Sequence, residues 1–233
     1  MYVCSHCDTQ SSKWSGKCLE CGKWGTIQEE ENETTARSSH LSSSTKAVQS
    51  KPLKEVAKQN EADRIATLDK EVDRVLGGGI VRGSLVLLSG EPGIGKSTLV
   101  AMIAGSVSGD VLYISGEESP TQLAARFERL KKKTDAIRFL EPYPVETLVA
   151  TIEKEKPVLA IIDSVQTLTS SNIESTAGTP TLVRYATALL LEVAKRTDVS
   201  ILLVGQVTKD GSVAGPKTLE HLVDVVMNLE GDP

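Results

Sequence analysis

The 233-residue sequence has no long apolar run and no excess of basic residues. No stretch approaches the ~20 apolar residues that a membrane-spanning helix needs. The opening residues, Met1-Tyr2-Val3-Cys4, lack the basic and apolar regions of a secretory signal, so we expect a cytoplasmic protein with no membrane partner. Lys and Arg number 26 against 31 Asp and Glu, which leaves a net charge of −5. Any contact with nucleic acid must then be local, because bulk charge opposes it.

Aromatic residues are also scarce, at 3% of the chain. Both tryptophans, Trp14 and Trp24, lie near the N-terminus. The rest of the chain holds Tyr113, Tyr143, Tyr185, Phe127 and Phe139. The main core must therefore be aliphatic, and a platform of several aromatic side chains for stacking bases is not expected in it.

Cysteine is absent after residue 21, so no disulfide framework holds the main core. The four cysteines form two C-x2-C pairs, Cys4 with Cys7 and Cys18 with Cys21. Two such pairs on facing turns supply the four thiolates of a tetrahedral zinc shell. Two disulfides or a thioredoxin-type redox pair are alternatives, disfavoured by the cytoplasmic context and by the lack of a preceding strand. We predict a structural zinc finger over residues 1–27, with His6 in a solvated loop.

Composition then changes twice along the chain. Acidic residues follow the cysteine-rich segment, and nine of the seventeen residues from Thr34 to Ser50 are Ser or Thr. Such a stretch buries too little apolar surface to offset its chain entropy, so residues 28–62 are predicted to be a flexible linker.

Residues 63–233 alternate short apolar runs with helix-length segments, which predicts an α/β domain. The apolar runs cover 84–88, 111–114, 136–140, 158–162 and 200–204, and residues 181–196 have helical spacing. Wholly apolar strands between helices indicate a mostly parallel sheet that is covered on both faces.

A phosphate-binding motif, G-x-x-x-x-G-K-[ST], follows the first of these strands and precedes a predicted helix over 98–107. The predicted nucleotide-binding residues are Gly90, Glu91, Pro92, Gly93, Ile94, Gly95, Lys96, Ser97 and Thr98. Lys96 would bridge the β- and γ-phosphates, and the Ser97 hydroxyl would hold Mg²⁺. A chance match in a glycine-rich turn is the alternative, which the flanking strand and helix disfavour. We therefore expect ATP and Mg²⁺ as cofactors.

Polar residues follow three other predicted strands. Asp163 follows the run 158–162, where a carboxylate holds Mg²⁺, although an N-cap role is an alternative. Glu117 and Glu118 follow the run 111–114, and we choose Glu117 as the general base for water, with Glu118 next. Gln206 follows the run 200–204, and its amide is expected to sense the γ-phosphate.

These motifs together resemble the RadA (Sms) family of bacterial DNA-repair proteins. Besides the zinc module and the phosphate loop, the resemblance rests on Val75-Leu76-Gly77-Gly78-Gly79-Ile80-Val81, Tyr113-Ile114-Ser115-Gly116-Glu117-Glu118-Ser119, Ile162-Asp163-Ser164-Val165-Gln166 and Gly205-Gln206-Val207-Thr208-Lys209-Asp210-Gly211. It covers nearly the whole chain apart from the linker.

The resemblance implies a RecA-like ATPase core that forms a homo-hexamer on single-stranded and branched DNA. It implies a DNA-stimulated ATPase in recombinational repair that processes or branch-migrates recombination intermediates beside a recombinase such as RecA. In RecA-like proteins the loops that correspond to 169–179 and 207–217 line the DNA channel. Lys209 and Lys217 are the best candidates for phosphate contact, although two solvated lysines are an alternative.

One departure from the family concerns the C-terminus. The family continues into a Lys-Asn-Arg-Phe-Gly motif and a domain like that of Lon protease, whereas this chain ends at Pro233. We therefore expect a C-terminally incomplete ATPase domain. Two other functions are kept open: an ATP-gated adaptor of a recombinase, and a helicase-like RecA-fold ATPase.

Overall fold

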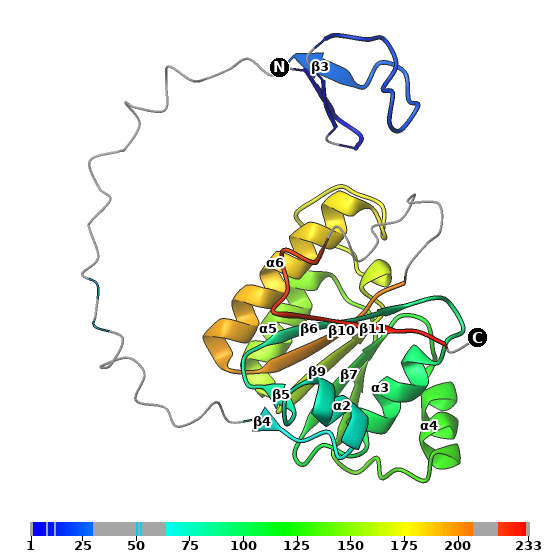
Figure 1. Cartoon of the computed structure of the whole chain (residues 1–233), viewed down its shortest axis with the longest axis vertical. Coiled ribbons are helices and arrows are strands. Elements are labelled where there is room, and N and C mark those ends of the chain that lie inside the picture. Colours follow the sequence, from blue (N-terminus) through cyan, green and yellow to red (C-terminus); the bar gives the residue numbers. More distant parts are fainter. Residues whose placement is uncertain are drawn as a thin grey trace. The chain divides into compact units, whose positions relative to one another are not determined.

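The structure is a computed structural model that describes residues 2–7, 9–11, 13–29, 50, 52, 64–206 and 219–231. The chain divides into two compact units, Met1–Gln59 and Asn60–Pro233 (Figure 1). Most of the predicted linker, and the predicted DNA loop 207–217 with Lys209 and Lys217, lie outside the described residues. Within the described part, no helix is both long and apolar enough to cross a membrane.

The first unit contains a three-stranded antiparallel sheet in the order β2-β1-β3. Its strands are β1 (Tyr2–Cys4), β2 (Gln10–Ser11) and β3 (Ile27–Glu29). The buried residues are Cys4, Cys18 and Ile27. So small an apolar core stabilises the fold of this unit only weakly. Two of its three buried residues are cysteines. β3 ends two residues beyond the predicted boundary at residue 27.

The second unit contains a six-stranded sheet in the order β11-β6-β10-β9-β7-β8, in which every neighbouring pair is parallel. The strands are β6 (Leu85–Gly90), β7 (Val111–Ser115), β8 (Ile137–Leu140), β9 (Leu159–Asp163), β10 (Ser200–Val204) and β11 (Val225–Leu229). The predicted parallel α/β architecture is confirmed, and the five predicted strands match β6 to β10 within one or two residues at each end.

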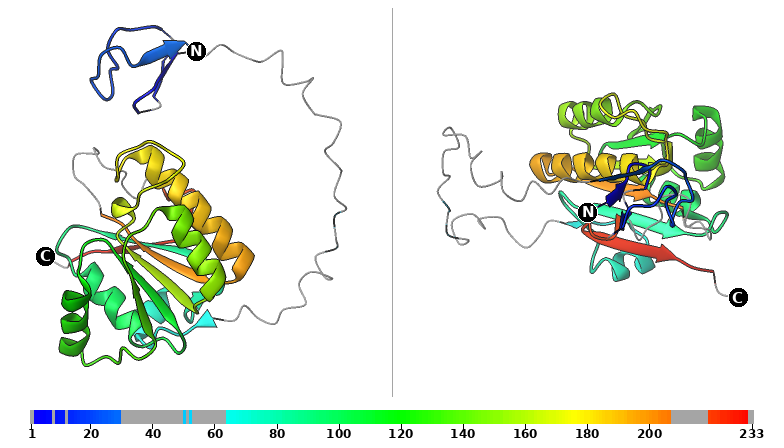
Figure 2. Two further views of the ribbon diagram at one scale, coloured as in Figure 1. Left: turned by 180° about the vertical axis from the view of Figure 1, so that it is seen from behind. Right: turned by 90° about the horizontal axis from the view of Figure 1, so that it is seen from above.

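Helices cover both faces of this sheet, which explains why its central strands are apolar throughout (Figures 1 and 2). Alternate residues of β6 point to opposite faces: Leu85 and Leu87 belong to one buried cluster, and Val86 and Leu88 belong to the other. The first cluster includes α5 (Val145–Glu155) and α6 (Pro180–Thr197). The second includes α2 (Lys70–Val75), α3 (Lys96–Ala104) and α4 (Pro120–Arg129). A two-stranded antiparallel pair, β4 (Arg64–Ile65) with β5 (Ile80–Val81), precedes the sheet.

The edge strand β11 was not among the predicted strands. It pairs with β6 in the register Val225↔Val86 to Leu229↔Gly90. Asp224 fixes its start, because one carboxylate oxygen accepts from the Leu85 amide at 2.9 Å and the other from Lys195 Nζ at 2.7 Å. β11 therefore lies directly beside the strand that leads into the phosphate loop.

Candidate functional site

A cavity of about 400 Å³ opens where β6, β7, β9 and β10 end. The carboxyl ends of parallel strands meet at one edge of a sheet, where ligands of such folds bind. The cavity is lined by Pro92, Gly93, Gly95, Lys96, Ser97, Thr98, Glu117, Arg126, Asp163, Val204 and Gln206. All four residues predicted to be catalytic therefore line one cavity, together with most of the predicted phosphate loop.

The phosphate loop runs from the end of β6 to the start of α3. Gly95 precedes α3 with φ of 108°, which few residues other than glycine adopt. A Cβ atom at Gly93 or Gly95 would meet no atom within 4 Å, so this backbone faces open space. Amides at the start of a helix beside such space form a site for anions.

Lys96 lies at the first turn of α3, and only 7% of it is exposed. Its Nζ donates to the carbonyl oxygens of Gly90 and Glu91, each at 2.8 Å. Burial lowers the pKa of Lys96, while the charges of Asp163 and Glu117 raise it and only partly offset burial. Carbonyl oxygens do not neutralise the charge of a buried ammonium, so Lys96 can still gain from binding an anion.

Asp163 ends β9 and is 3% exposed. Burial raises the pKa of its carboxyl, and a hydrogen bond with the Ser97 side chain acts in the opposite direction. Tyr113, which is fully buried, donates from its hydroxyl to Asp163 Oδ2 at 3.4 Å. Ser97 and Asp163, the two residues predicted to hold Mg²⁺, thus line the same cavity. A hydroxyl and a carboxylate are oxygen ligands of the kind that Mg²⁺ prefers, so the residues present fit the ion.

Glu117 follows β7 and connects the ends of two other strands. Its Oε1 accepts from Ser164 Oγ at 2.7 Å and from Gln206 Nε2 at 2.9 Å. Ser164 follows Asp163 at the end of β9, and Gln206 lies two residues after β10. The carboxylate is therefore held in a fixed orientation, yet it remains exposed and lines the cavity.

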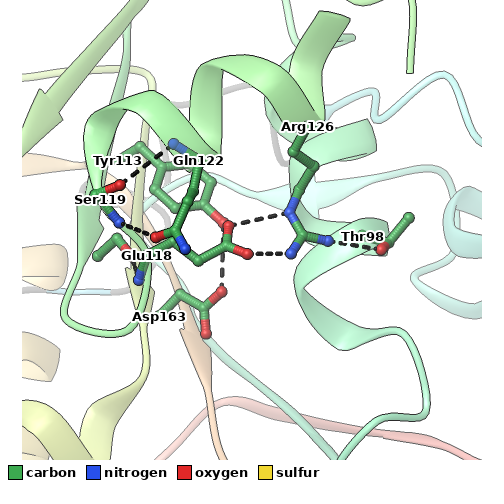
Figure 3. A network of polar contacts seen from close by, with 8 residues as sticks. Thr98, Tyr113, Glu118, Ser119, Gln122, Arg126 and Asp163 are labelled. Atoms are coloured by element: carbon green, nitrogen blue, oxygen red, sulfur yellow. Dashed lines mark hydrogen bonds and ion pairs between the residues drawn. The ribbon is translucent and has the colours of Figure 1, made fainter. Parts of the chain in front are cut away.

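Glu118 has a different environment from Glu117. It forms an ion pair with Arg126 of α4, and its amide donates to Ser115 Oγ at 3.0 Å (Figure 3). Arg126 Nη1 also donates to Thr98 Oγ1 at 2.9 Å, and the hydrogen bond to Glu118 raises the pKa of the guanidinium. The Glu118 carboxylate is thus neutralised by a cation, whereas Glu117 is held by neutral groups.

Arg126, Ser164 and Tyr113 contribute to the site but were not predicted as site residues. Arg126 reaches the cavity because α4 begins immediately after Glu118. Ser119 and Gln122 form a reciprocal capping box there, and Pro120 occupies the first turn (Figure 3). That capping sequence was a usable signal for the start of the helix. Nothing in the local sequence indicates that Ser164 faces a residue 47 positions earlier.

The loop 169–179, predicted to line a DNA channel, is held by Glu146 of α5. Ser170 Oγ donates to Glu146 Oε1 at 2.6 Å, and the Ser171 amide donates to Oε2 at 3.0 Å. Asn172 Nδ2 donates to the Tyr185 hydroxyl at 3.1 Å. The loop contains no lysine or arginine, so it offers no cation to a phosphate.

The four cysteines of the first unit form a second site. Their Sγ atoms all lie within 4.8 Å of one another. Cys4 Sγ is 3.7 Å from Cys21 Sγ, and Cys7 Sγ is 3.6 Å from Cys18 Sγ. A tetrahedron with Zn–S bonds of about 2.3 Å has edges of about 3.8 Å, so the cluster fits a zinc ion.

Electrostatics at the cysteines are also those of a metal site. Burial raises the pKa of Cys4, but hydrogen bonds from Thr26 and from nearby backbone amides outweigh burial and lower it to about 6. A backbone hydrogen bond from Lys23 lowers the pKa of Cys21, but burial and the neighbouring thiols outweigh it and raise the pKa to about 12. Cys4 therefore favours the thiolate form that a metal ion binds, and a bound cation would favour the thiolate of Cys21 as well.

Comparisons with known proteins agree with both sites. Residues 49–212 match the family described as AAA domain, and residues 2–29 match the family described as rubredoxin metal binding domain. The chain is similar to proteins named DNA repair protein RadA. It is 44% identical to that of Mycobacterium tuberculosis over 236 residues, 42% to that of Aquifex aeolicus over 237, and 41% to that of Bacillus subtilis over 236. Each match covers 99% of this chain and 49 to 52% of the relative, so the chain spans about half the length of these relatives.

Proposed function

Because the chain belongs to the AAA-domain family, we propose that it hydrolyses ATP and acts in DNA repair. The observation that carries this proposal is the arrangement around one cavity: a buried lysine, a buried aspartate and an oriented but exposed glutamate, each at the end of a different parallel strand or on the phosphate loop. The role in repair rests on the similarity to the DNA repair proteins RadA.

In this proposal the phosphate loop binds the nucleotide. The backbone amides from Gly93 to Thr98 surround the phosphates, and Lys96 contributes the charge that binds the terminal ones. Ser97 and Asp163 would hold Mg²⁺, which when bound would offset the negative charge that develops during phosphoryl transfer. Tyr113 orients the Asp163 carboxylate through its hydroxyl.

Glu117 acts as the general base that orients water and accepts its proton. The hydrogen bonds from Ser164 and Gln206 orient one carboxylate oxygen and leave the other available. Glu118 is a poorer candidate for the base, because its carboxylate is engaged by Arg126 and does not line the cavity. The role of Glu118 is instead to fix Arg126 beside Thr98.

Gln206 senses the terminal phosphate. Its side-chain amide donates to Glu117, and residues 207–217 follow Gln206 in the sequence, so Gln206 is placed to relay the presence of the phosphate to that segment. We assign Lys209 and Lys217 to the contact with DNA phosphates, on single-stranded or branched DNA. Assembly as a hexamer, action beside a recombinase such as RecA, and processing of recombination intermediates belong to the same proposal and follow from the family resemblance.

The first unit is a structural zinc module in this proposal. Cys4, Cys7, Cys18 and Cys21 fill all four positions of a tetrahedral shell, which leaves no open position for a substrate. We retain the proposed division into a zinc finger over 1–27, a linker over 28–62 and an ATPase domain over 63–233.

A second candidate function is an ATP-gated adaptor that binds nucleotide without turning it over. The orientation of Glu117 favours hydrolysis over this alternative. A helicase-like ATPase shares the same core, and DNA-unwinding assays separate it from the favoured function.

The test compares ATP binding and ATP hydrolysis, with and without single-stranded DNA, in four variants of the full chain. Lys96→Ala should weaken binding and abolish hydrolysis. Glu117→Gln keeps the shape of the side chain, so it should bind ATP normally and hydrolyse it about 100-fold more slowly or worse. Glu118→Gln tests the neighbouring carboxylate, and Glu128→Gln, an exposed residue of α4 outside the cavity, is the matched control. Hydrolysis by Glu117→Gln at the parental rate would exclude Glu117 as the base. Tight ATP binding with no hydrolysis in the parent would favour the adaptor.

A further inference from the structure

Two large aromatic side chains of the first unit are exposed. Trp14 is 64% exposed and Trp24 is 76% exposed, although indoles are among the side chains that gain most from burial. The core of this unit consists of Cys4, Cys18 and Ile27 and does not include either indole. The tryptophans are therefore not explained by the packing of the fold.

The two indoles lie on the same side of Gly16. A Cβ atom at Gly16 would lie 3.7 Å from Cζ3 of Trp24 and 4.0 Å from Cη2 of Trp14. The backbone fixes this arrangement, because Lys17 and Trp24 form an antiparallel bridge and the Gly25 amide donates to the Gly16 carbonyl at 2.8 Å. Two neighbouring aromatic side chains are thus held at the surface by one hairpin-like segment, and a side chain at position 16 would contact both rings.

The same segment carries three exposed cations. Residues 13–24 include three lysines and a single acidic residue, Glu20, in a chain whose net charge is −5. Lys13, Lys17 and Lys23 are all exposed. Lys17 Nζ lies 5.9 Å from the centre of the Trp24 ring, within the range of a cation–π contact. Positive charge and aromatic surface therefore occur together.

We propose that Trp14 and Trp24 form a stacking site for the bases of single-stranded nucleic acid, with Lys13, Lys17 and Lys23 contacting its phosphates. Under the proposed function, on which this choice rests, the strand is DNA. Aromatic side chains beside lysines are the means by which proteins bind single strands without regard to sequence. The charge of the segment favours a polyanion over a neutral apolar protein surface, so a protein partner is treated as the competing outcome.

The sequence makes this site directly observable. The chain has two tryptophans, and both belong to the site, so tryptophan fluorescence excited at the red edge of the absorption band reports on it alone. Stacked bases quench indole emission. The titration uses the full zinc-loaded chain without nucleotide, and its probes are oligo(dT) and an abasic oligonucleotide of the same length and charge. We expect oligo(dT) to quench the emission and to bind more tightly than the abasic strand.

Variants at the pair decide the inference. Loss of one stacked base corresponds to an affinity about fivefold to 100-fold weaker, so Trp24→Ala and Trp14→Ala should each weaken oligo(dT) binding by that factor, measured with labelled DNA. Trp24→Phe keeps an aromatic ring at this position and should therefore bind oligo(dT) much more tightly than Trp24→Ala does. Leu19→Ala is the matched control, because Leu19 is an apolar residue of the same unit, 91% exposed, and should bind as the parent does. Zinc content of each variant shows that the unit is folded.

Other outcomes would overturn the proposal. Equal binding of the oligo(dT) and abasic strands would mean that the lysines act without the indoles. If the Trp variants bind zinc and keep the DNA affinity of the parent, the indoles do not contact DNA, and a protein partner becomes the favoured explanation for their exposure. The Lys209→Ala, Lys217→Ala double variant separates the stacking site from the proposed repair function. If this variant loses DNA binding while the Trp variants keep it, the proposed function still holds and the stacking site is excluded.

Discussion

Gln206 donates from Nε2 to Glu117 Oε1 at 2.9 Å, and this contact joins residues 89 positions apart at the ends of β10 and β7. Ser164, from the end of β9, donates to the same oxygen at 2.7 Å. The residue proposed to activate water and the residue proposed to sense phosphate therefore share a hydrogen bond. Loss of either side chain removes this hydrogen bond from the other residue, so substitutions at the pair test both roles directly.

We expect Gln206→Ala to separate ATP binding from its consequences. The variant removes one of the two hydrogen bonds that orient Glu117, so hydrolysis should fall by about 10-fold to 100-fold while ATP affinity changes little. Any stimulation by DNA should be lost, because in the proposed function Gln206 relays the presence of nucleotide to residues 207–217. Steady-state hydrolysis with and without DNA, beside equilibrium ATP binding, checks this. A Gln206→Ala chain that keeps both its rate and its DNA response would argue against the link.

Arg126 and Glu118 should be strongly coupled in stability. Their side chains are 18% and 21% exposed, so solvent screens the ion pair only partly. Arg126→Met leaves the Glu118 carboxylate without its cation and should lower the free energy of unfolding by roughly 2 kcal/mol. The double variant, Arg126→Met with Glu118→Gln, should lose less than the sum of the losses in the two single variants. Urea unfolding of the parent, both single variants and the double variant gives the coupling energy. A coupling near zero would show that the pair contributes nothing.

Gly90→Ala should destabilise the ATPase unit through β11. Gly90 has φ of 156°, and a Cβ atom there would lie 2.6 Å from the carbonyl oxygen of Leu229, which is backbone and cannot turn aside. We expect a loss of about 2–4 kcal/mol in the free energy of unfolding without nucleotide. Gly93→Ala is the matched control, because its φ is also positive but its Cβ would meet open space, so it should lose less. Equal losses would contradict the contact with β11.

Removal of zinc should unfold the first unit alone. Cys4→Ser should release the metal, because three thiolates and a hydroxyl bind zinc far more weakly than four thiolates. Tryptophan emission should then shift with the unfolding of residues 1–27, and the urea midpoint of the ATPase unit should stay within the error of its measurement. Absence of metal in freshly purified, reduced protein would end the zinc assignment.

DNA binding through residues 207–217 should be salt-sensitive. Each lost phosphate contact lowers the slope of log affinity against log salt by about 0.7 for a single strand, so Lys209→Ala with Lys217→Ala should lower it by about 1.4 for each chain engaged. A non-hydrolysed ATP analogue should tighten parental binding by about 1–3 kcal/mol if nucleotide binding is coupled to DNA binding by this segment. The measurement requires a form of the protein that assembles. An unchanged slope and no effect of the analogue would remove this segment from the DNA site.

The parts of the fold that could be predicted are those with a local cause. β6, β9 and β10 are buried on both faces, so their sequences are unbroken apolar runs, and the phosphate loop has a fixed spacing between a strand and a helix. β11 lies at the edge of the sheet, where Met227 is its single buried residue and Val226 is 41% exposed. Its sequence, Val-Val-Met-Asn-Leu, is nevertheless apolar at four of five positions, so a strand signal was present and was missed.

The candidate site divides in the same way. Glu117, Asp163 and Gln206 were predicted because each follows an apolar run, and in a parallel sheet that position is enough to bring them to one edge. Arg126 and Ser164 could not be chosen from sequence, since their roles depend on which strands are neighbours. The order β10-β9-β7 makes Ser164 and Gln206 neighbours of Glu117, and that order is a property of the whole sheet.

The two carbonyl contacts of Lys96 have a thermodynamic consequence for nucleotide affinity. The ammonium has three N–H donors, and two of them already bond to the oxygens of Gly90 and Glu91, each at 2.8 Å. The third donor is available to a phosphate, but every further contact with phosphate requires one carbonyl bond to be given up. The heat released on binding should then be smaller than a count of the contacts in the bound state would suggest, because part of the binding is an exchange of hydrogen-bond partners.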